Sequence, residues 1–254
     1  MGALLSVEDL TVRYGGVTAL DGVSFDVEEG RIVGLIGPNG AGKTTCIDAL
    51  TGFVTPTAGH CSFDGTPLAA VPPHALARRG FTRTFQSLEL FDDLTVRENL
   101  LVAATTPTWR STLTDALWPK RHASAATDEV VELLDLGAVA DRVPADLSNG
   151  QRHLVAVGRA LVARPKLVLL DEPAAGLDTG ETAELGRLLR TLPERGVTVL
   201  LVDHDMPLVL GVCDEVLVLD FGRIIARGTP DEVRADPAVV AAYLGRPEPH
   251  EVDR

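Results

Sequence analysis

The stretch GPNGAGKT, residues 37–44, constrains the fold more than any other part of this 254-residue chain. It fits the pattern G-x-x-x-x-G-K-[S/T] at every position, follows an apolar strand-like run at 31–37, and opens a helical pattern from about Lys43 to Leu50. Glycines let the backbone fold tightly enough for successive N–H groups to point at one anion, and a helix N-terminus adds partial positive charge. The sequence therefore predicts a phosphate-binding loop between a buried strand and a helix.

Residues of this loop are expected to hold a nucleotide and its metal ion. We expect Lys43 to reach the β- and γ-phosphates and Thr44 to offer its hydroxyl to Mg²⁺. The nucleotide-binding residues predicted for the loop are Gly37, Pro38, Asn39, Gly40, Ala41, Gly42, Lys43, Thr44 and Thr45.

Acidic residues end a second buried run, LVLLDEP at 167–173. Ligands of open α/β sheets bind at the carboxyl ends of the strands, so Asp171 is placed to hold the magnesium ion, directly or through water. Neighbouring side chains at a strand end point in different directions, and Glu172 is therefore interpreted as the general base or water orienter. Two acidic residues can also merely end a strand, but the phosphate loop in the same chain favours the catalytic interpretation.

A histidine follows the third buried run, VTVLLV at 197–202. The end of this strand lies at the same sheet edge as Asp171, so His204 is predicted to contact the γ-phosphate or the attacking water. The alternative is an ordinary histidine at the start of a helix.

Strand and helix patterns alternate over most of the chain, which predicts an α/β fold with a mostly parallel sheet and helices on both faces. The first 30 residues instead alternate apolar and polar positions, as antiparallel strands do, and 215–228 is typical of a hairpin turning near Phe221–Gly222. Residues 87–147 contain no strong buried strand and are interpreted as a helical insertion, with helical patterns around 96–103 and 128–136 and with 105–122 as a loop-rich excursion. Another helical pattern, at 206–212, follows the buried run at 197–202.

Charge and cysteine content narrow the function further. The formal net charge is −13, from 36 acidic and 23 basic residues, which argues against a non-specific binder of polyanions. The three cysteines show no metal-ligand spacing and suit a reducing compartment. No secretory leader and no apolar run of about 18 residues are recognised, so we expect a cytosolic chain whose membrane attachment comes through a partner.

The stretch LSNGQ, residues 147–151, predicts a second anion-binding helix start. Ser148 is a good N-cap for a helix running to the break at Arg164–Pro165. Asn149–Gly150 could form a hairpin turn, but no alternating strand follows. This helix start has no lysine, so it makes sense as half of a site completed by a second subunit.

In this order and spacing, the motifs resemble those of ABC-type ATPases, the nucleotide-binding subunits of ATP-driven transporters. GPNGAGKTT resembles the Walker A loop, LVLLDEP the Walker B strand with its catalytic Glu172, and LSNGQ the signature motif, with Asn149 in place of the commoner glycine. The resemblance implies further site residues: Tyr14 stacking on adenine, Gln86 of the Q-loop near Mg²⁺ and the water, Asp178 of the D-loop, the switch histidine His204, and Ser148, Gly150 and Gln151 at the signature.

The resemblance also implies an architecture and an assembly. Residues 1–254 form one ABC ATPase domain, in which 1–86 and 160–254 make a RecA-like P-loop NTPase core with an antiparallel β subdomain. Residues 87–159 make an inserted helical subdomain carrying the signature motif. Two such subunits, identical or related, would sandwich ATP head to tail between one Walker A loop and the other's LSNGQ.

The chain is most similar to the ATPase subunits of bacterial branched-chain amino acid importers, through stretches 83–103, 171–178 and 202–245. This similarity implies transmembrane permease partners, an indirect link to a substrate-binding protein, and a peripheral position on the cytoplasmic face of the cell membrane. The permease would insert a short helix near Gln86 and residues 87–90.

Two other functions were weighed against transport. A soluble ABC ATPase acting on nucleic acid or the ribosome usually carries long coiled-coil insertions or two cassettes, whereas this chain has one cassette and an acidic balance. A GTPase usually shows N-K-x-D, which is absent here, and DFG at 220–222 has no preceding HRD and is therefore interpreted as a hairpin turn rather than a kinase motif.

Overall fold

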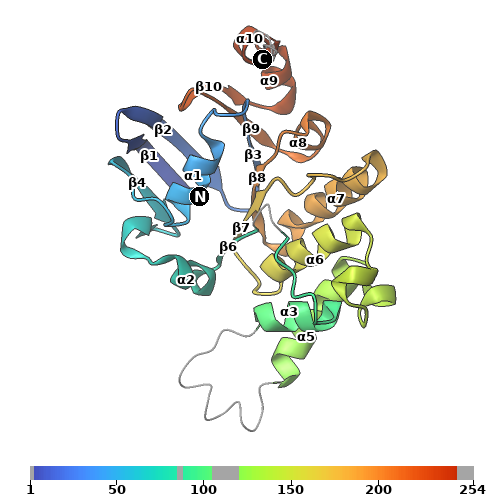
Figure 1. The fold of residues 1–254 in the computed structure, drawn as a ribbon. Helices are drawn as coiled ribbons and strands as arrows, with labels where there is room; N and C mark the ends of the chain where they lie inside the picture. The colour runs from blue at the N-terminus through green and yellow to red at the C-terminus, as the bar shows by residue number, and fades with distance from the viewer. Residues whose placement is uncertain (1–2, 85–87, 105–119, 245–254) are drawn as a thin grey trace, which may run out of the picture. The chain divides into compact units, whose positions relative to one another are not determined.

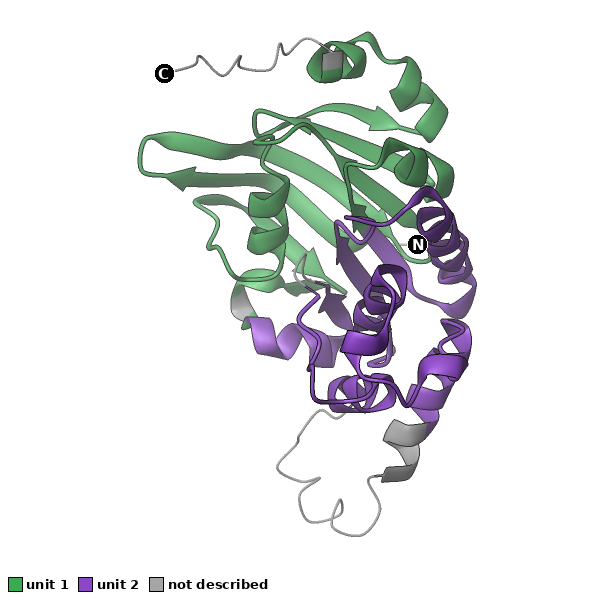
Figure 2. Cartoon of the chain, turned by 45° about the vertical axis from the view of Figure 1, so that its right-hand side comes forward, with its two compact units in different colours: residues 1–72, 201–254 green, residues 73–200 purple. Residues whose placement is uncertain are grey.

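The structure is a computed structural model that describes residues 3–84, 88–104 and 120–244. The chain divides into two compact units, coloured separately in Figure 2. Unit 1 comprises residues 1–72 and 201–254, and unit 2 comprises residues 73–200. Each unit is described by itself.

Unit 1 contains an antiparallel sheet, part of a mainly parallel sheet, and the helices that follow its strands (Figure 1). Its elements are β1 (Ala3–Tyr14), β2 (Val17–Glu28), β3 (Ile32–Ile36), α1 (Lys43–Leu50), β4 (Ala58–Phe63), β5 (Thr66–Pro67), η1 (Leu68–Ala70), α8 (Met206–Val212), β9 (Glu215–Asp220), β10 (Arg223–Gly228), α9 (Pro230–Ala235) and α10 (Pro237–Leu244).

The antiparallel sheet has the strand order β2-β1-β4-β5. In β2, buried Val23, Phe25 and Val27 alternate with exposed neighbours, as expected for a sheet with one face against the core. The second sheet of unit 1 has the order β10-β9-β3, with β3 and β9 parallel. All five residues of β3 are buried, which is the pattern of a central strand covered on both faces.

Unit 2 combines short parallel strands with most of the long helices (Figure 1). Its elements are α2 (Pro73–Leu76), η2 (Ala77–Arg79), β6 (Phe81–Arg83), α3 (Val96–Ala104), α5 (Lys120–Leu133), η3 (Gly137–Val139), η4 (Pro144–Asp146), α6 (Asn149–Leu161), β7 (Leu167–Asp171), α7 (Thr179–Thr191), η5 (Pro193–Arg195) and β8 (Thr198–Val202), whose last two residues pass into unit 1.

The strands of unit 2 follow the order β8-β7-β6, and β6 runs parallel to β7. A glycine lets helix α6 pack tightly against its neighbours. A Cβ on Gly158 would lie 2.7 Å from Leu134 Cδ1 and 2.9 Å from Leu100 Cδ2. A larger residue there would force these leucine side chains to shift, so the glycine allows α6 to pack closely against α3 and the end of α5.

Most of the elements expected from the sequence are present, and the fold is of the expected α/β class, with a mainly parallel sheet and an antiparallel one. Helices α1 and α8 and the β9–β10 hairpin agree with their predicted ranges. Three expectations were incomplete or wrong. The short strands β4 to β6 were not predicted, α5 begins at Lys120 rather than near Asp128, and the predicted excursion therefore ends before 120. Residues 105–119 lie outside the described residues, and the boundaries 1–86, 87–159 and 160–254 stay a prediction.

None of the helices described in Figure 1 is long and apolar enough to cross a bilayer.

Candidate functional site

The phosphate loop of unit 1 is held in a tight turn between β3 and α1. A Cβ on Gly37 would lie 2.1 Å from the carbonyl oxygen of Leu219 in β9, and one on Gly42 would lie 2.7 Å from the carbonyl oxygen of Ala19 in β2. Gly42 also has a φ of 110°, in the region that favours glycine. Both glycines are therefore required by close backbone approach, and the loop is clamped by two other strands.

The turn of the β9–β10 hairpin supports the loop from one side. The N–H of Gly222 donates to the carbonyl oxygen of Ala41 at 2.8 Å, and the N–H of Asp21 donates to the carbonyl oxygen of Gly222 at 2.9 Å. The turn at 220–222 that the sequence predicted therefore links the phosphate loop to β2 through these two hydrogen bonds.

The lysine of the loop lies folded over its own turn. Lys43 is 8% exposed, and its Nζ donates to the carbonyl oxygens of Gly37 at 2.6 Å and Pro38 at 3.3 Å. Thr44 and Asn39 are exposed and Thr45 is half-buried. The loop therefore holds a positive charge within its own turn and exposes a hydroxyl at a helix N-terminus, and both features suit a loop that binds phosphate.

Two further predicted residues of unit 1 are exposed. Tyr14 ends β1 with 52% of its surface exposed, so its ring is accessible for stacking. The side chain of His204 is 61% exposed after β8. The carboxylate of the fully buried Asp203 accepts hydrogen bonds from the N–H groups of His204 at 2.7 Å and Asp205 at 2.9 Å. Asp203, to which the sequence assigned no role, thus fixes the turn that carries His204.

In unit 2, the predicted metal-binding carboxylate is engaged by an arginine. Asp171 Oδ2 accepts a hydrogen bond from Arg83 Nη2 at 3.0 Å, and the two side chains are only 12% and 9% exposed. The N–H of Asp171 donates to Thr84 Oγ1 at 3.1 Å. Strand β6 therefore neutralises and orients the end of β7, an arrangement that sequence analysis missed.

Glu172 follows with an unusual backbone conformation. Its φ is 48°, in the left-handed region that non-glycine residues adopt at a cost of about 1 kcal/mol or more. The carbonyl oxygen of Glu172 accepts from the N–H of Ala175 at 3.1 Å, so a tight turn holds this conformation. The chain therefore turns sharply at Glu172, directly after the end of β7.

The LSNGQ stretch forms a capped helix start in unit 2. Ser148 is the N-cap of α6, its Oγ accepts from the N–H of Gln151 at 3.2 Å, and Gln151 Oε1 accepts from the N–H of Ser148 at 3.0 Å. This reciprocal capping box confirms the predicted helix start. Ser148 is exposed, whereas Gly150 is buried.

The start of α6 is also joined to the start of α7, which carries Asp178. Asn149 Nδ2 donates to the carbonyl oxygen of Gly176 at 2.7 Å, and the N–H of Gly150 donates to Glu181 Oε1 at 3.0 Å. Asp178 is the N-cap of α7 and accepts from the N–H of Glu181 at 2.9 Å. The structure therefore brings the predicted signature residues and the predicted D-loop residue into one bonded cluster.

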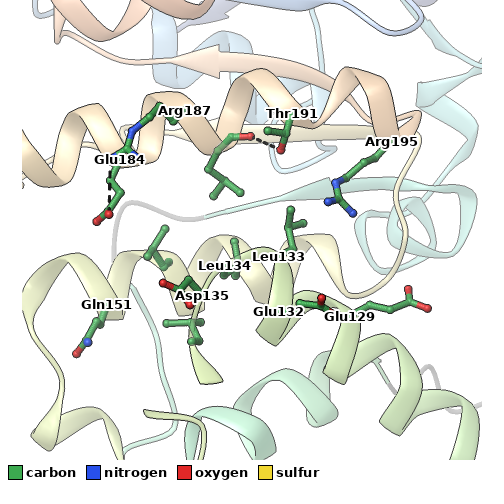
Figure 3. Close-up of a pocket in the computed structure, with 13 residues that line it drawn as sticks. Glu129, Glu132, Leu133, Leu134, Asp135, Gln151, Glu184, Arg187, Thr191 and Arg195 are labelled. Carbon is green, nitrogen blue, oxygen red and sulfur yellow. Dashed lines mark hydrogen bonds and ion pairs between the residues drawn. The ribbon is translucent and has the colours of Figure 1, made fainter. Parts of the chain in front are cut away.

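A cavity of about 770 Å³ opens beside this cluster (Figure 3). Glu184, Arg187, Thr191 and Arg195 face the end of α5 across it, and Gln151 lies at one end (Figure 3). Gln151 and Glu184 also line a smaller cavity of about 160 Å³ next to Gly150 and Glu181. The signature helix start is thus bordered by open space on its α7 side.

The residues predicted to bind the metal ion carry oxygen donors, the ligand type that hard cations prefer. No group of three or more His, Cys, Asp or Glu side chains with metal-site geometry occurs among the described residues. Thr44 carries an exposed hydroxyl, and Asp171 carries a carboxylate that is paired with Arg83. Lys43 and Thr44 belong to unit 1 and Asp171 to unit 2. Gln86, the other predicted metal and catalytic residue, lies outside the described residues.

Three contributors escaped the sequence analysis: Arg83, Asp203 and Glu181. Asp203 is next to its partner His204 in the chain, whereas Arg83 lies 88 residues before its partner Asp171. A pairing across such a distance cannot be recognised from the sequence. Glu181 could have been found from its position three residues after the N-cap Asp178, which is the capping-box spacing, whereas the residues around Arg83 give no such signal.

Comparison with known proteins places this arrangement in a family. Residues 20–175 match the ABC transporter family, and residues 223–249 match a segment described as "Branched-chain amino acid ATP-binding cassette transporter". The chain is 41% identical to the high-affinity branched-chain amino acid transport ATP-binding protein BraF of Pseudomonas aeruginosa, over 95% of this chain and 98% of that protein.

Solved structures agree with these matches. The ADP conformation of an ATP-binding cassette of an ABC transporter is 34% identical and superimposes with a TM-score of 0.85, covering 97% of this chain and 100% of that chain. A dimeric ATP-binding cassette in a post-hydrolysis state, bound to ADP and Pi, is 25% identical with a TM-score of 0.74, covering 89% of this chain and 98% of that one.

Proposed function

Because this chain belongs to the ABC transporter family and is an ATPase of that family, we propose that it powers the uptake of branched-chain or related amino acids through a separate permease. The match of residues 223–249 supports this class of cargo, and so does the transport function named for the relative from Pseudomonas aeruginosa. Both are named for transport, so neither supports the alternative of a soluble ATPase acting on nucleic acid or the ribosome.

One observation carries the proposal of a shared catalytic site. The chain has a lysine-bearing phosphate loop in unit 1. In unit 2 it has another helix start, that of α6, which is capped by the exposed Ser148 and has no lysine between 147 and 151. A helix N-terminus without a cation holds phosphate weakly by itself. We infer that α6 completes the nucleotide site of a second ABC ATPase subunit, identical or related.

Different residues of the chain would bind the nucleotide, hold the metal ion and activate the water that hydrolyses ATP. Lys43 and the N–H groups of the loop would bind the β- and γ-phosphates, and Tyr14 would stack on the adenine. Thr44 and Asp171 would hold Mg²⁺, which would neutralise charge on the phosphate oxygens. Glu172 accepts a proton from the attacking water. The water oxygen bonds to the γ-phosphorus, the bond to the β–γ bridging oxygen breaks, and ADP and phosphate leave.

The remaining predicted residues orient this reaction. His204 and Gln86 position the water and the γ-phosphate, while Ser148, Gly150 and Gln151 of one subunit face the nucleotide of the other, with Asp178 beside them. Permease subunits anchor the ATPase pair at the cytoplasmic face of the membrane, and a substrate-binding protein delivers the cargo to them. Closing and opening of the pair then drives the permease.

Glu172→Gln tests this proposal, with Glu194→Gln as the control because Glu194 is an exposed acidic residue of the same unit. Loss of a general base lowers rates by about 10²- to 10⁴-fold, so Glu172→Gln is expected to bind ATP, hydrolyse it at least about 100-fold more slowly, and form an ATP-dependent dimer. In cells that depend on this chain for uptake, Glu172→Gln should abolish accumulation of labelled leucine, isoleucine or valine, and Glu194→Gln should not.

The two halves of the proposal fail in different ways. Wild-type ATP turnover by Glu172→Gln would refute the assignment of the base. Normal amino acid uptake in cells that lack the chain would refute the cargo while leaving the ATPase assignment intact.

A further inference from the structure

The carboxylate of Glu181 occupies the start of the signature helix. Its Oε1 accepts from the N–H of Gly150 at 3.0 Å, and its Oε2 accepts from the N–H of Asp178 at 3.2 Å. One side chain in the first turn of α7 therefore bridges the backbone of the LSNGQ stretch and the backbone of the D-loop aspartate.

The surroundings hold this carboxylate in place. Asp178 Oδ1 accepts from the N–H of Glu181 at 2.9 Å, which completes a capping box and fixes the first turn of α7. A Cβ on Gly150 would lie 2.5 Å from Glu181 Oε1, so a glycine is needed there for the carboxylate to approach. The small cavity lined by Ser148, Gly150, Leu177 and Glu181 offers space beside the bridge.

The bridge conflicts with the shared site described above. The N–H of Gly150 carries a single hydrogen, and it cannot make a full hydrogen bond to Glu181 and to a phosphate oxygen at the same time. Two anions at one helix start also repel each other, so an incoming γ-phosphate must displace the carboxylate.

We propose that Glu181 is a positioning residue that gates the signature site, an inference that rests on the shared site. Its carboxylate satisfies the start of α6 until the γ-phosphate of the second subunit replaces it. The displacement breaks the bridge to the N–H of Asp178, so arrival of the phosphate is relayed directly to the D-loop. Glu181 thereby raises the ATP concentration at which two subunits close.

The test measures ATP-driven dimerisation of the full chain carrying Glu172→Gln, by analytical ultracentrifugation across an ATP–Mg²⁺ titration. Glu181→Gln is compared with Glu184→Gln, one turn along the same helix, which removes the same charge from an exposed side chain lining the same small cavity. Glu181→Gln should lower the ATP concentration for half-dimerisation roughly fivefold, because a charge-assisted hydrogen bond no longer has to be broken. Glu184→Gln should change it by less than about twofold.

Each outcome decides the question. A merely structural role for Glu181 predicts the opposite sign, because a disordered helix start would require more ATP. An unchanged or raised midpoint in Glu181→Gln, with a dimerising parent, overturns the gate alone. Absence of any ATP-dependent dimer in the Glu172→Gln parent overturns the shared site and the gate with it. Glu181→Ala is measured in parallel, with urea unfolding of every variant, so that a folding defect of one substitution does not decide the result.

Discussion

Removing Arg83 should destabilise the chain far more than removing an exposed arginine. Arg83 Nη2 lies 3.0 Å from Asp171 Oδ2, and the two side chains are 9% and 12% exposed. Breaking such a pair from one side leaves a carboxylate largely shielded from water and costs about 3–5 kcal/mol. Because water still reaches a small part of both groups, we expect Arg83→Met to lower the free energy of unfolding by about 3 kcal/mol.

The matched control is Arg97→Met, which removes the same charge from the same unit. Arg97 pairs with Asp128, and these side chains are 42% and 56% exposed. Exposed pairs contribute about 0–1 kcal/mol, so the control should lose less than about 1 kcal/mol.

Urea unfolding followed by circular dichroism measures both variants, and the linear extrapolation gives each free energy. In a chain of this size the expected loss for Arg83→Met corresponds to a fall in Tm of roughly 6–12 °C. Equal losses in the two variants would refute the reasoning, because burial of the Arg83–Asp171 pair would then have no energetic effect.

Two further predictions concern the signature loop and the thiols. Asn149→Gly should lower the free energy of unfolding by about 1 kcal/mol in urea titrations. The substitution removes the hydrogen bond to Gly176 and gives the unfolded chain more backbone freedom at the start of α6. A loss above about 3 kcal/mol would contradict this account. Burial raises the pKa of Cys46 and of Cys213 to about 12, so neither thiol should react with a disulfide reagent at pH 8 until the chain is unfolded. Because these pKa values are raised on folding, the free energy of unfolding should fall as pH rises through the window from 9 to about 12. Fast labelling of the folded chain, or a free energy of unfolding that does not change over this window, would show that the two thiols are not buried.

The phosphate loop was predictable because its geometry depends on contiguous residues. Buried β3, the glycines at 37, 40 and 42, and α1 from Lys43 follow each other directly, so local backbone preference and hydrophobic patterning determine them. The same holds for the start of α6, where Ser148 and Gln151 cap one another across three residues.

Short strands and helix ends were harder to predict from the sequence. Strands β4 to β6 contain six, two and three residues, and β6 is too short for periodicity to separate it from a loop. The early start of α5 was missed because the residues before Asp128 show no clear apolar repeat.

The sequence by itself determined which residues form the phosphate loop, the acidic strand end and the signature helix start, since each is written in a few neighbouring positions. Only the tertiary structure decided that Arg83 meets Asp171 across 88 residues and that Glu181 meets Gly150 across 31. Such pairings arise when strands and helices pack together, and packing brings distant side chains to a common point that no local spacing specifies.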